Sequence, residues 1–295
     1  MQNDSHNKGE HWLILGCGYL GSEVARRLLA SGAAVDALTR NVQQAESLRA
    51  MGVSRVIQAR LDTTDWHEQA EGHYDGVLDC VSSAGGGMEG YRASYVGGMQ
   101  SVVAWSKSRE NALPLFLYTG STGVYAQNDG SWVDEQAATS DQTERGAILC
   151  EAEQLIQTKL HAARRVILRL AGIYGPGRTY FIDQVREGQA IRGRAQNYLN
   201  LIHRDDAASA ILKCSQTRQP HGLYNLSDNH PATREDIAAW VAEKYDLPCP
   251  AFDDSQTTRR NVPNRRICSN AIQQELGWVP AYPSYQHGFS SLMSV

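Results

Sequence analysis

Three glycines near the amino terminus have the spacing most often used to bind a dinucleotide. Gly16, Gly18 and Gly21 read G-x-G-x-x-G between an apolar run and a segment of helical period. The first glycine permits a tight turn, the second lets the backbone approach a pyrophosphate, and the third lets the helix pack on the strand. The helix start at Tyr19 and Leu20 would then offer free N–H groups to the phosphates. The alternative is a glycine-rich turn that binds nothing.

The end of the next apolar segment distinguishes the two common dinucleotides. An acidic residue about 20 residues after the glycines would bond to the ribose 2′-hydroxyl of NAD. Thr39 occupies that place and Arg40 follows it, and a guanidinium pairs with the 2′-phosphate of NADP. We therefore predict NADP, with NAD less favoured and a solvated Arg40 as the non-binding alternative. Asp36 lies inside the strand, whereas Asp62, after the following strand, either contacts adenine or caps a turn.

Strands and helices that alternate along the chain must position these residues. Apolar runs typical of strands lie at 12–15, 34–38, 55–59, 76–81, 114–120 and 165–171. Segments of helical period lie at 20–31, 42–51, 91–108 and 143–162. This alternation predicts an α/β fold with a doubly wound parallel sheet of the Rossmann type.

The pattern changes after Gly-Pro-Gly at 175–177, which continues neither helix nor strand. We therefore expect a disordered amino terminus over 1–10, an NAD(P)-binding Rossmann domain over 11–175 and a smaller, mainly substrate-binding region over 176–295. Within that region, about 200–228 partly returns to the Rossmann domain.

Composition and charge exclude several classes of protein. The 28 Lys and Arg against 32 Asp and Glu give a net charge of −4, which argues against nucleic acid as the main partner. No apolar run approaches a membrane span and the amino terminus is polar, so we expect neither a membrane anchor nor a signal segment. The six cysteines have no C-x-x-C pair, so we expect no metal site and no disulfide framework, and a reducing cytoplasmic location.

Several stretches of the chain resemble the extended branch of the short-chain dehydrogenase/reductase superfamily, which includes NAD-dependent epimerases and dehydratases of nucleotide sugars. They span nearly the whole chain, and they are LGCGYLG (15–21), LYTGSTGVY (117–125), LRLAGIYGPGR (168–178), LIHRDDAASAI (201–211), GLYNLSD (222–228) and ELGWVP (275–280). The resemblance implies a coenzyme-binding Rossmann domain and a carboxyl-terminal substrate region with the active site in a cleft between them. It also implies a homodimer, and it adds Ser82 and Tyr174 to the expected coenzyme contacts.

The catalytic pair of that family is missing. The resemblance implies a Tyr and a Lys four residues apart on one helix, where the Lys lowers the pKa of the Tyr and the Tyr exchanges a proton with the substrate. Alignment of RGAILCEAE (145–153) with the family pattern places Arg145 at the Tyr and Leu149 at the Lys. Ser121, or its neighbour Thr122, matches the residue that polarises the substrate oxygen. The chain therefore resembles atypical members without the Tyr-x-x-x-Lys pair.

Some other group must then donate the proton if the site is catalytic. Tyr95 stands where the family usually has Asn, and Tyr125 ends the matched Val-Tyr motif, so both are candidates, with core packing as the alternative. Arg145 is a candidate for holding an anionic substrate or coenzyme. It is not a candidate proton donor, because its pKa is too high for acid–base work. Glu144 is a candidate base, or else it complements the helix dipole.

A few further residues carry weaker expectations. His203 and Asp206 resemble family positions that tie the domains together, and we interpret them as structural. Arg178 is a candidate substrate contact beside the Gly-Pro-Gly loop.

Two functions remain open at this point. The first is an NAD(P)-dependent oxidoreductase, or a nucleotide-sugar epimerase/dehydratase-like enzyme, that uses a non-standard proton donor on a small carbonyl or hydroxyl compound. The second is a non-catalytic NADP-binding protein that senses redox state or regulates a partner.

Overall fold

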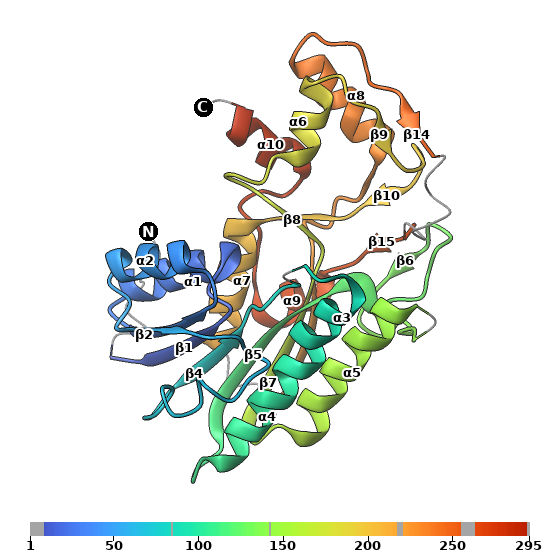
Figure 1. The fold of residues 1–295 in the computed structure, drawn as a ribbon. Coiled ribbons are helices and arrows are strands. Elements are labelled where there is room, and N and C mark those ends of the chain that lie inside the picture. Colours follow the sequence, from blue (N-terminus) through green and yellow to red (C-terminus); the bar gives the residue numbers. More distant parts are fainter. Residues whose placement is uncertain (1–8, 84, 142, 217–220, 255–262, 294–295) are drawn as a thin grey trace. The chain divides into compact units, whose positions relative to one another are not determined.

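A computed structural model describes residues 9–83, 85–141, 143–216, 221–254 and 263–293. Most of the expected disordered terminus, residues 1–8, lies outside this described part. The chain divides into two compact units (Figure 1). Unit 1 comprises Met1–Val124, Thr139–Arg169 and Ala208–Tyr224, and unit 2 comprises Tyr125–Ala138, Leu170–Ala207 and Asn225–Val295. The sequence-based boundary at 175 stays a prediction.

A seven-stranded sheet forms the centre of unit 1, with strand order β12-β7-β5-β4-β1-β2-β3. Its strands are β1 (His11–Leu15), β2 (Ala34–Thr39), β3 (Arg55–Gln58), β4 (Gly76–Asp79), β5 (Leu113–Ser121), β7 (Ala162–Leu170) and β12 (His221–Leu226). The pairs from β5 through β4, β1 and β2 to β3 are all parallel. All four residues of β4 are buried, and β1 is buried after its first residue. Continuous burial is what a parallel sheet covered on both faces requires, and it confirms the predicted doubly wound class.

Helices cover both faces of this sheet. They are α1 (Tyr19–Ala30), α2 (Val42–Met51), α3 (Gly87–Arg92), the π-helical turn η2 (Ala93–Gly97), α4 (Gly98–Ser108), the 3-10 turn η3 (Thr122–Val124), α5 (Glu144–Lys159) and α7 (Arg204–Ser215). Figure 1 shows α1 and α2 over one face and α3 to α5 over the other. None of the helices in the described residues is long and apolar enough to cross a bilayer.

The helix predicted over 91–108 is present, but it begins earlier, at Gly87, and it contains an irregular turn. The segment forms α3, a π-helical turn at Ala93–Gly97 and then α4. Gly97 and Gly98 lie where this turn meets the β3 loop: a Cβ on Gly97 would stand 3.3 Å from the Cβ of Asp62, and one on Gly98 would stand 3.0 Å from Leu61 Cδ2. Two adjacent glycines weaken a regular helix, and π turns are frequent at functional sites.

The long helix predicted over 143–162 is shorter than expected. It ends at Lys159 because Leu160 adopts extended backbone angles. β7 then begins at Ala162, three residues before the predicted strand. The amide of Leu113 donates to the carbonyl of His161 at 3.0 Å, so pairing with β5 already begins there.

Unit 2 is built from short elements around its own apolar core. They are β6 (Trp132–Val133), β8 (Gly172–Tyr174), α6 (Tyr180–Arg186), β9 (Ile191–Arg192), β10 (Tyr198–Leu199), β11 (Leu201–His203), β13 (Ala232–Thr233), α8 (Arg234–Lys244), β14 (Phe252–Asp253), β15 (Arg266–Ile267), α9 (Asn270–Leu276) and α10 (Tyr285–Met293). The strands pair two by two, as β8 with β11, β10 with β13, β9 with β14 and β6 with β15. α6, α8 and α10 contribute most of the core.

A buried ion pair joins α5 to the sheet of unit 1. Arg169 on β7 donates to both carboxylate oxygens of Glu153 on α5, at 3.0 and 2.7 Å, and both side chains are about 5% exposed. Breaking such a pair leaves a buried charge unpaired, which costs much more than the loss of a surface pair.

We predict that Arg169→Met lowers the free energy of unfolding by about 3–5 kcal/mol, because Glu153 then stays buried without its guanidinium. The matched control is Arg92→Met, which removes the exposed pair between α3 and Glu151 of α5 and should cost about 0–1 kcal/mol. Urea unfolding of both variants at pH 7 measures the difference. Equal losses would contradict the importance assigned to the buried pair.

Candidate active site

The first turn of the glycine motif accepts only glycine. Gly16 has a φ of +74°, and a Cβ there would lie 2.5–2.6 Å from atoms of Val81. The amides of Gly16 and Cys17 both donate to the carbonyl of Leu38, at 3.0 and 2.9 Å. The turn is therefore held between the ends of β2 and β4, where it passes directly against the backbone that leads to Ser82.

The next two glycines differ in their surroundings. A Cβ on Gly18 would meet nothing nearer than the Gly16 carbonyl oxygen at 3.9 Å, so this position faces open space. A Cβ on Gly21 would lie 3.1 Å from the same oxygen and 3.2 Å from Ile14 Cγ2. At this position the helix therefore packs closely on the strand, and a side chain would have little room. α1 begins at Tyr19 with no side-chain cap and no acidic residue in its first turn. An anion placed at Gly18 would therefore meet backbone and a helix dipole rather than side chains.

Charged side chains gather where β2 and β3 end. Thr39 is buried and accepts a hydrogen bond from the Asn41 amide, whereas Arg40 is exposed. Arg60 donates to both oxygens of Asp62 at 2.9 and 2.6 Å. This bond is the main reason that the pKa of Asp62 is lowered, and the charge of Arg40 lowers it further.

The sequence interpretation overlooked Arg60, which also brings a positive charge to this edge of the sheet. Its position two residues before Asp62, just after a strand, was the available signal. Asp62 itself is an ion-pair partner in this structure, which favours neither of the two roles considered for it.

A buried carboxyl group ends β4. Asp79 is 3% exposed and accepts a hydrogen bond from the amide of Val81 at 2.9 Å. Burial raises the pKa of Asp79 to about 7, although the hydrogen bond from Val81 acts to lower it. Ser82 follows on the exposed loop.

The end of β5 brings Ser121 close to α5. Ser121 Oγ accepts a hydrogen bond from the Gly123 amide at 3.0 Å, and Thr122 begins the 3-10 turn. A Cβ on Gly123 would lie 3.2 Å from Ser121 Oγ and 3.3 Å from Leu149 Cδ1. The position that aligns with the family lysine thus lies beside the predicted polarising serine, but it holds a buried leucine and supplies no charge.

Two phenols and a guanidinium lie together on the neighbouring helices. The rings of Tyr91 on α3 and Tyr95 on η2 have centroids 4.6 Å apart. The guanidinium carbon of Arg145, in the first turn of α5, lies 5.2 Å from the centre of the Tyr91 ring. Burial raises the pKa of Tyr95, and the charge of Asp79 adds to this rise. The sequence interpretation selected Tyr95 and Arg145 but overlooked Tyr91, whose only signal was its i,i+4 spacing from Tyr95.

Other candidates have structural surroundings within unit 2. Tyr125 is buried, and its hydroxyl donates to Asn225 Oδ1 at 2.7 Å. Tyr174 is buried edge-on against the rings of His203 and Phe289, at 5.3 and 5.0 Å. These contacts favour packing roles for both tyrosines.

Asp206 also makes a contact inside unit 2, since its carboxylate accepts the amides of Ala281 and Tyr282 at 2.7 and 2.9 Å. The backbone of Arg178 closes the Gly-Pro-Gly loop by bonding to Gly175. Glu144 is exposed at the start of α5.

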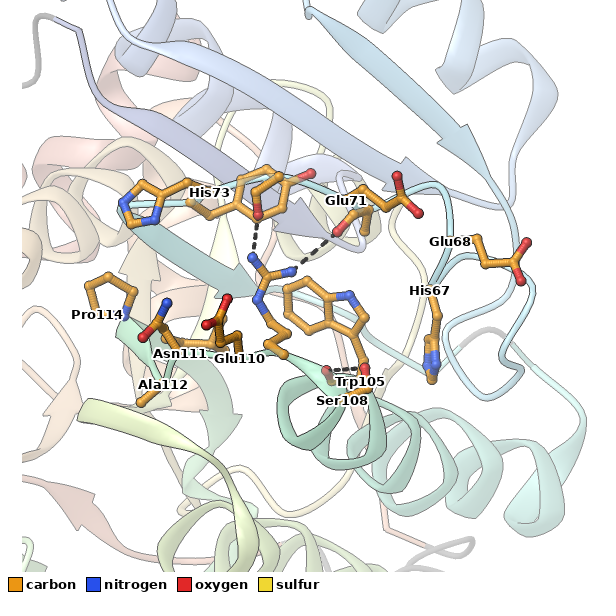
Figure 2. Close-up of a pocket in the computed structure, with 15 residues that line it drawn as sticks. His67, Glu68, Glu71, His73, Trp105, Ser108, Glu110, Asn111, Ala112 and Pro114 are labelled. Atoms are coloured by element: carbon orange, nitrogen blue, oxygen red, sulfur yellow. Dashed lines mark hydrogen bonds between the residues drawn. The ribbon is translucent and has the colours of Figure 1, made fainter.

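A separate pocket of about 530 Å³ lies at the opposite edge of the sheet (Figure 2). Its lining includes the residues just before β4 and β5, so it is at the amino-terminal edge, whereas Gly16 and Ser121 follow the carboxyl ends of their strands. Arg109 lies over the rings of Trp105 and Tyr74 there and donates to the carbonyls of Ala70 and Gly72. This pocket is therefore distinct from the candidate active site.

Comparisons with known proteins bear on the family and the fold of this chain. A model of the NAD dependent epimerase/dehydratase family matches residues 12–227. Protein YeeZ of Escherichia coli strain K12 is 26% identical over 282 residues, which cover 92% of this chain and 95% of YeeZ. A 2-alkyl-3-oxoalkanoate reductase of Shewanella oneidensis is 27% identical over 266 residues, which cover 82% of this chain and 67% of that protein. The crystal structure of a dTDP-glucose 4,6-dehydratase of Bacillus anthracis in complex with NAD has a TM-score of 0.81 and 14% identity, covering 97% of this chain and 96% of its own.

Asp79 predicts a pH dependence of stability. An unfolded aspartate ionises near 3.8, whereas folded Asp79 ionises near 7. Between these values the unfolded chain releases the proton and the folded chain keeps it, so this group lowers stability as pH rises from about 4 to about 7. Asp79→Asn cannot ionise, and its stability relative to the natural chain should therefore increase from pH 4 to pH 8, by at most about 4 kcal/mol.

Thermal unfolding at several pH values measures this difference, with Asp65→Asn, an exposed aspartate of the same unit, as control. A constant difference between Asp79→Asn and the natural chain across pH 4–8 would rule out the raised pKa.

Proposed function

The chain belongs to the NAD dependent epimerase/dehydratase family, and from this premise we propose that it is an NADP-dependent oxidoreductase, or an epimerase/dehydratase-like enzyme, with a non-standard proton donor. One observation carries the proposal. At Gly18 the backbone stands open beside an uncapped helix start, while Gly16 and Gly21 on either side are closely packed. A bound pyrophosphate requires an open backbone at the second glycine and close packing at the first and third.

The residues around the glycine turn fit a nicotinamide dinucleotide. Gly16 and Gly21 form the turn, and Gly18 with the backbone of Tyr19 and Leu20 would hold the pyrophosphate. Ser82 would contact the coenzyme from the β4 loop that Val81 brings against Gly16. When bound, the coenzyme would supply or accept the hydride.

The charge at the end of β2 supports NADP over NAD. Arg40 is exposed there, and Asp62 nearby is already bonded to Arg60. A 2′-phosphate at this edge would therefore meet two guanidiniums and one carboxylate, whereas no acidic residue occupies the place of Thr39 to accept a ribose 2′-hydroxyl.

We predict that Arg40→Ala weakens NADP binding at least tenfold, about 1.4 kcal/mol, and leaves NAD binding nearly unchanged, because only NADP carries the 2′-phosphate. Isothermal calorimetry with both coenzymes measures the two affinities. Arg49→Ala, which removes an exposed arginine from the last turn of α2, is the control and should alter neither. Equal losses for NADP and NAD would show that Arg40 does not contact the phosphate.

Tyr95 is the proton donor that the geometry favours. Its phenol lies in the cluster with Tyr91 and Arg145 within unit 1, whereas the hydroxyl of Tyr125 is already bonded to a buried asparagine. In the reductive direction the bound coenzyme would supply the hydride that the carbonyl carbon gains and would itself become oxidised. The carbonyl oxygen gains the proton of Tyr95, and solvent then restores that proton. Ser121 would donate a hydrogen bond to the same oxygen.

We propose a small carbonyl compound or the corresponding alcohol as substrate. The Shewanella relative is a reductase of 2-alkyl-3-oxoalkanoates, and the Bacillus structure is a dehydratase of dTDP-glucose. Both substrate classes therefore belong in a first panel, together with other nucleotide sugars and simple ketones.

We predict that the purified chain oxidises NADPH in the presence of at least one member of this panel, and that Tyr95→Phe lowers kcat about 100-fold or more, because it removes the acid. Absorbance at 340 nm measures turnover for reductive reactions, and product analysis measures it for epimerisation and dehydration. Tyr125→Phe is the control and should retain most of kcat. Tight NADP binding with no turnover across the panel would instead favour the non-catalytic sensor.

A further inference from the structure

Unit 2 exposes a tryptophan that the proposed function does not use. Of the six tryptophans, all of which lie in the described residues, four are at most 4% exposed, whereas Trp132 on β6 is 53% exposed. A single exposed apolar side chain needs no explanation by itself. Trp132, however, lines a cavity, and an aromatic ring in a cavity with a few polar groups is typical of a ligand site.

The cavity has a volume of about 390 Å³, within the range of about 300–1,000 Å³ that small-molecule sites have. Its other lining residues are mostly polar, and they are Asp134, Asn229, Cys268 and Asn270. All five residues belong to unit 2, and none is a candidate for the proposed reaction.

Arg266 holds the indole ring of Trp132 in place. β6 and β15 are parallel neighbours with Trp132 opposite Arg266 (Figure 1), so the two side chains can meet across the strand pair. The guanidinium carbon of Arg266 lies 5.2 Å from the centre of the Trp132 ring and 5.1 Å from that of Tyr198. Its Nε also donates to the carbonyl of Gly130 at 2.8 Å. A ring that is already ordered loses little conformational entropy when a ligand stacks on it.

Two polar side chains of the cavity have unused hydrogen-bonding capacity. Asp134 Oδ1 accepts the amide of Gln136 at 3.0 Å, while Oδ2 has no partner among the described residues. Asn270 Oδ1 accepts from Asn229 Nδ2 at 2.8 Å, which leaves the Nδ2 of Asn270 as a donor. The cavity therefore combines an ordered aromatic ring with a carboxylate acceptor and an amide donor.

We propose that this cavity binds a neutral pyranose sugar, with one face of the sugar against Trp132 and its hydroxyl groups on Asp134 and Asn270. A pyranose presents C–H groups on its faces and hydroxyls around its edge, and each hydroxyl can both donate and accept. The inference does not depend on the proposed function, because it requires neither coenzyme nor turnover.

The charges beside the ring disfavour the charged ligands that an exposed indole could take. A cation would stack on the ring by a cation–π interaction, but Arg266 already lies over it with a positive charge. An anion would be repelled by the carboxylate of Asp134, which lines the same cavity. A neutral ligand with an apolar face and several hydroxyls meets neither obstacle.

A sugar titration of the full chain without coenzyme tests the inference. The probes are D-glucose, D-galactose and N-acetyl-D-glucosamine, and saturation-transfer NMR on the sugar protons measures binding. At least one of them should bind with a dissociation constant of about 1–10 mM, as expected for a ligand of about a dozen heavy atoms. Trp132→Ala should weaken this binding at least tenfold.

Asp134→Asn provides a second variant that disturbs the fold less. It keeps the Oδ1 that accepts the Gln136 amide and replaces only the unpartnered carboxylate oxygen. It should weaken binding about threefold to tenfold, because a hydrogen bond to a charged acceptor is stronger than one to a neutral group. This variant decides the question if Trp132→Ala does not fold.

Tyr180→Ala is the matched control. Tyr180 on α6 is a 71% exposed aromatic residue of the same unit that does not line the cavity, and its removal should leave the titration unchanged. No binding of the three sugars up to about 50 mM, or undiminished binding in Trp132→Ala or in Asp134→Asn, would overturn the inference. Binding of adenosine or tetramethylammonium in place of every sugar would also overturn it. Sugar binding that depends on Trp132 in a chain with no NADPH turnover would support this inference and refute only the proposed function.

Discussion

The close approach of Gly16 to Val81 is the contact on which the rest of the site depends. It brings the turn after β1 against the loop after β4, with a left-handed backbone and no room for a side chain. Because the strands are parallel, their carboxyl ends lie at one edge of the sheet, and this contact decides how closely the loops there meet. The same edge carries the open backbone at Gly18, the buried carboxyl of Asp79 and the exposed Ser82.

The candidate active site follows the family in its scaffold and departs from it in its ionisable groups. Ser121 ends β5 beside α5, as the resemblance implies, but position 149 contributes an apolar side chain and position 145 a guanidinium. Two phenols, Tyr91 and Tyr95, lie close together on α3 and the π-helical turn. A π turn changes the direction of the side chains that follow it, which gives one physical reason for an irregular helix at this point. The buried pair of Glu153 and Arg169 holds α5 on the sheet while its first turn presents Arg145.

The sheet and the glycine turn were predictable because their signals are local. Apolar runs of strand length, helical spacing between them and three glycines at fixed intervals each depend on neighbours within a few residues. The interrupted helix was not predictable in this way. Gly97 and Gly98, where the π-helical turn joins α4, lie close to Asp62 and Leu61, which are more than 30 residues away in the chain.

The sequence alone determined the fold class, the place of the glycine turn and the absence of a Tyr-x-x-x-Lys pair, since each is a matter of residue type and spacing. It also selected Arg40, Tyr95 and Arg145 as candidates without ordering them. Only the tertiary structure decided which of these side chains meet, that Tyr91 joins them, and that the hydroxyl of Tyr125 is engaged elsewhere. The reason is that contact between side chains on separate elements is decided by how those elements pack, and that packing depends on residues distant in the sequence.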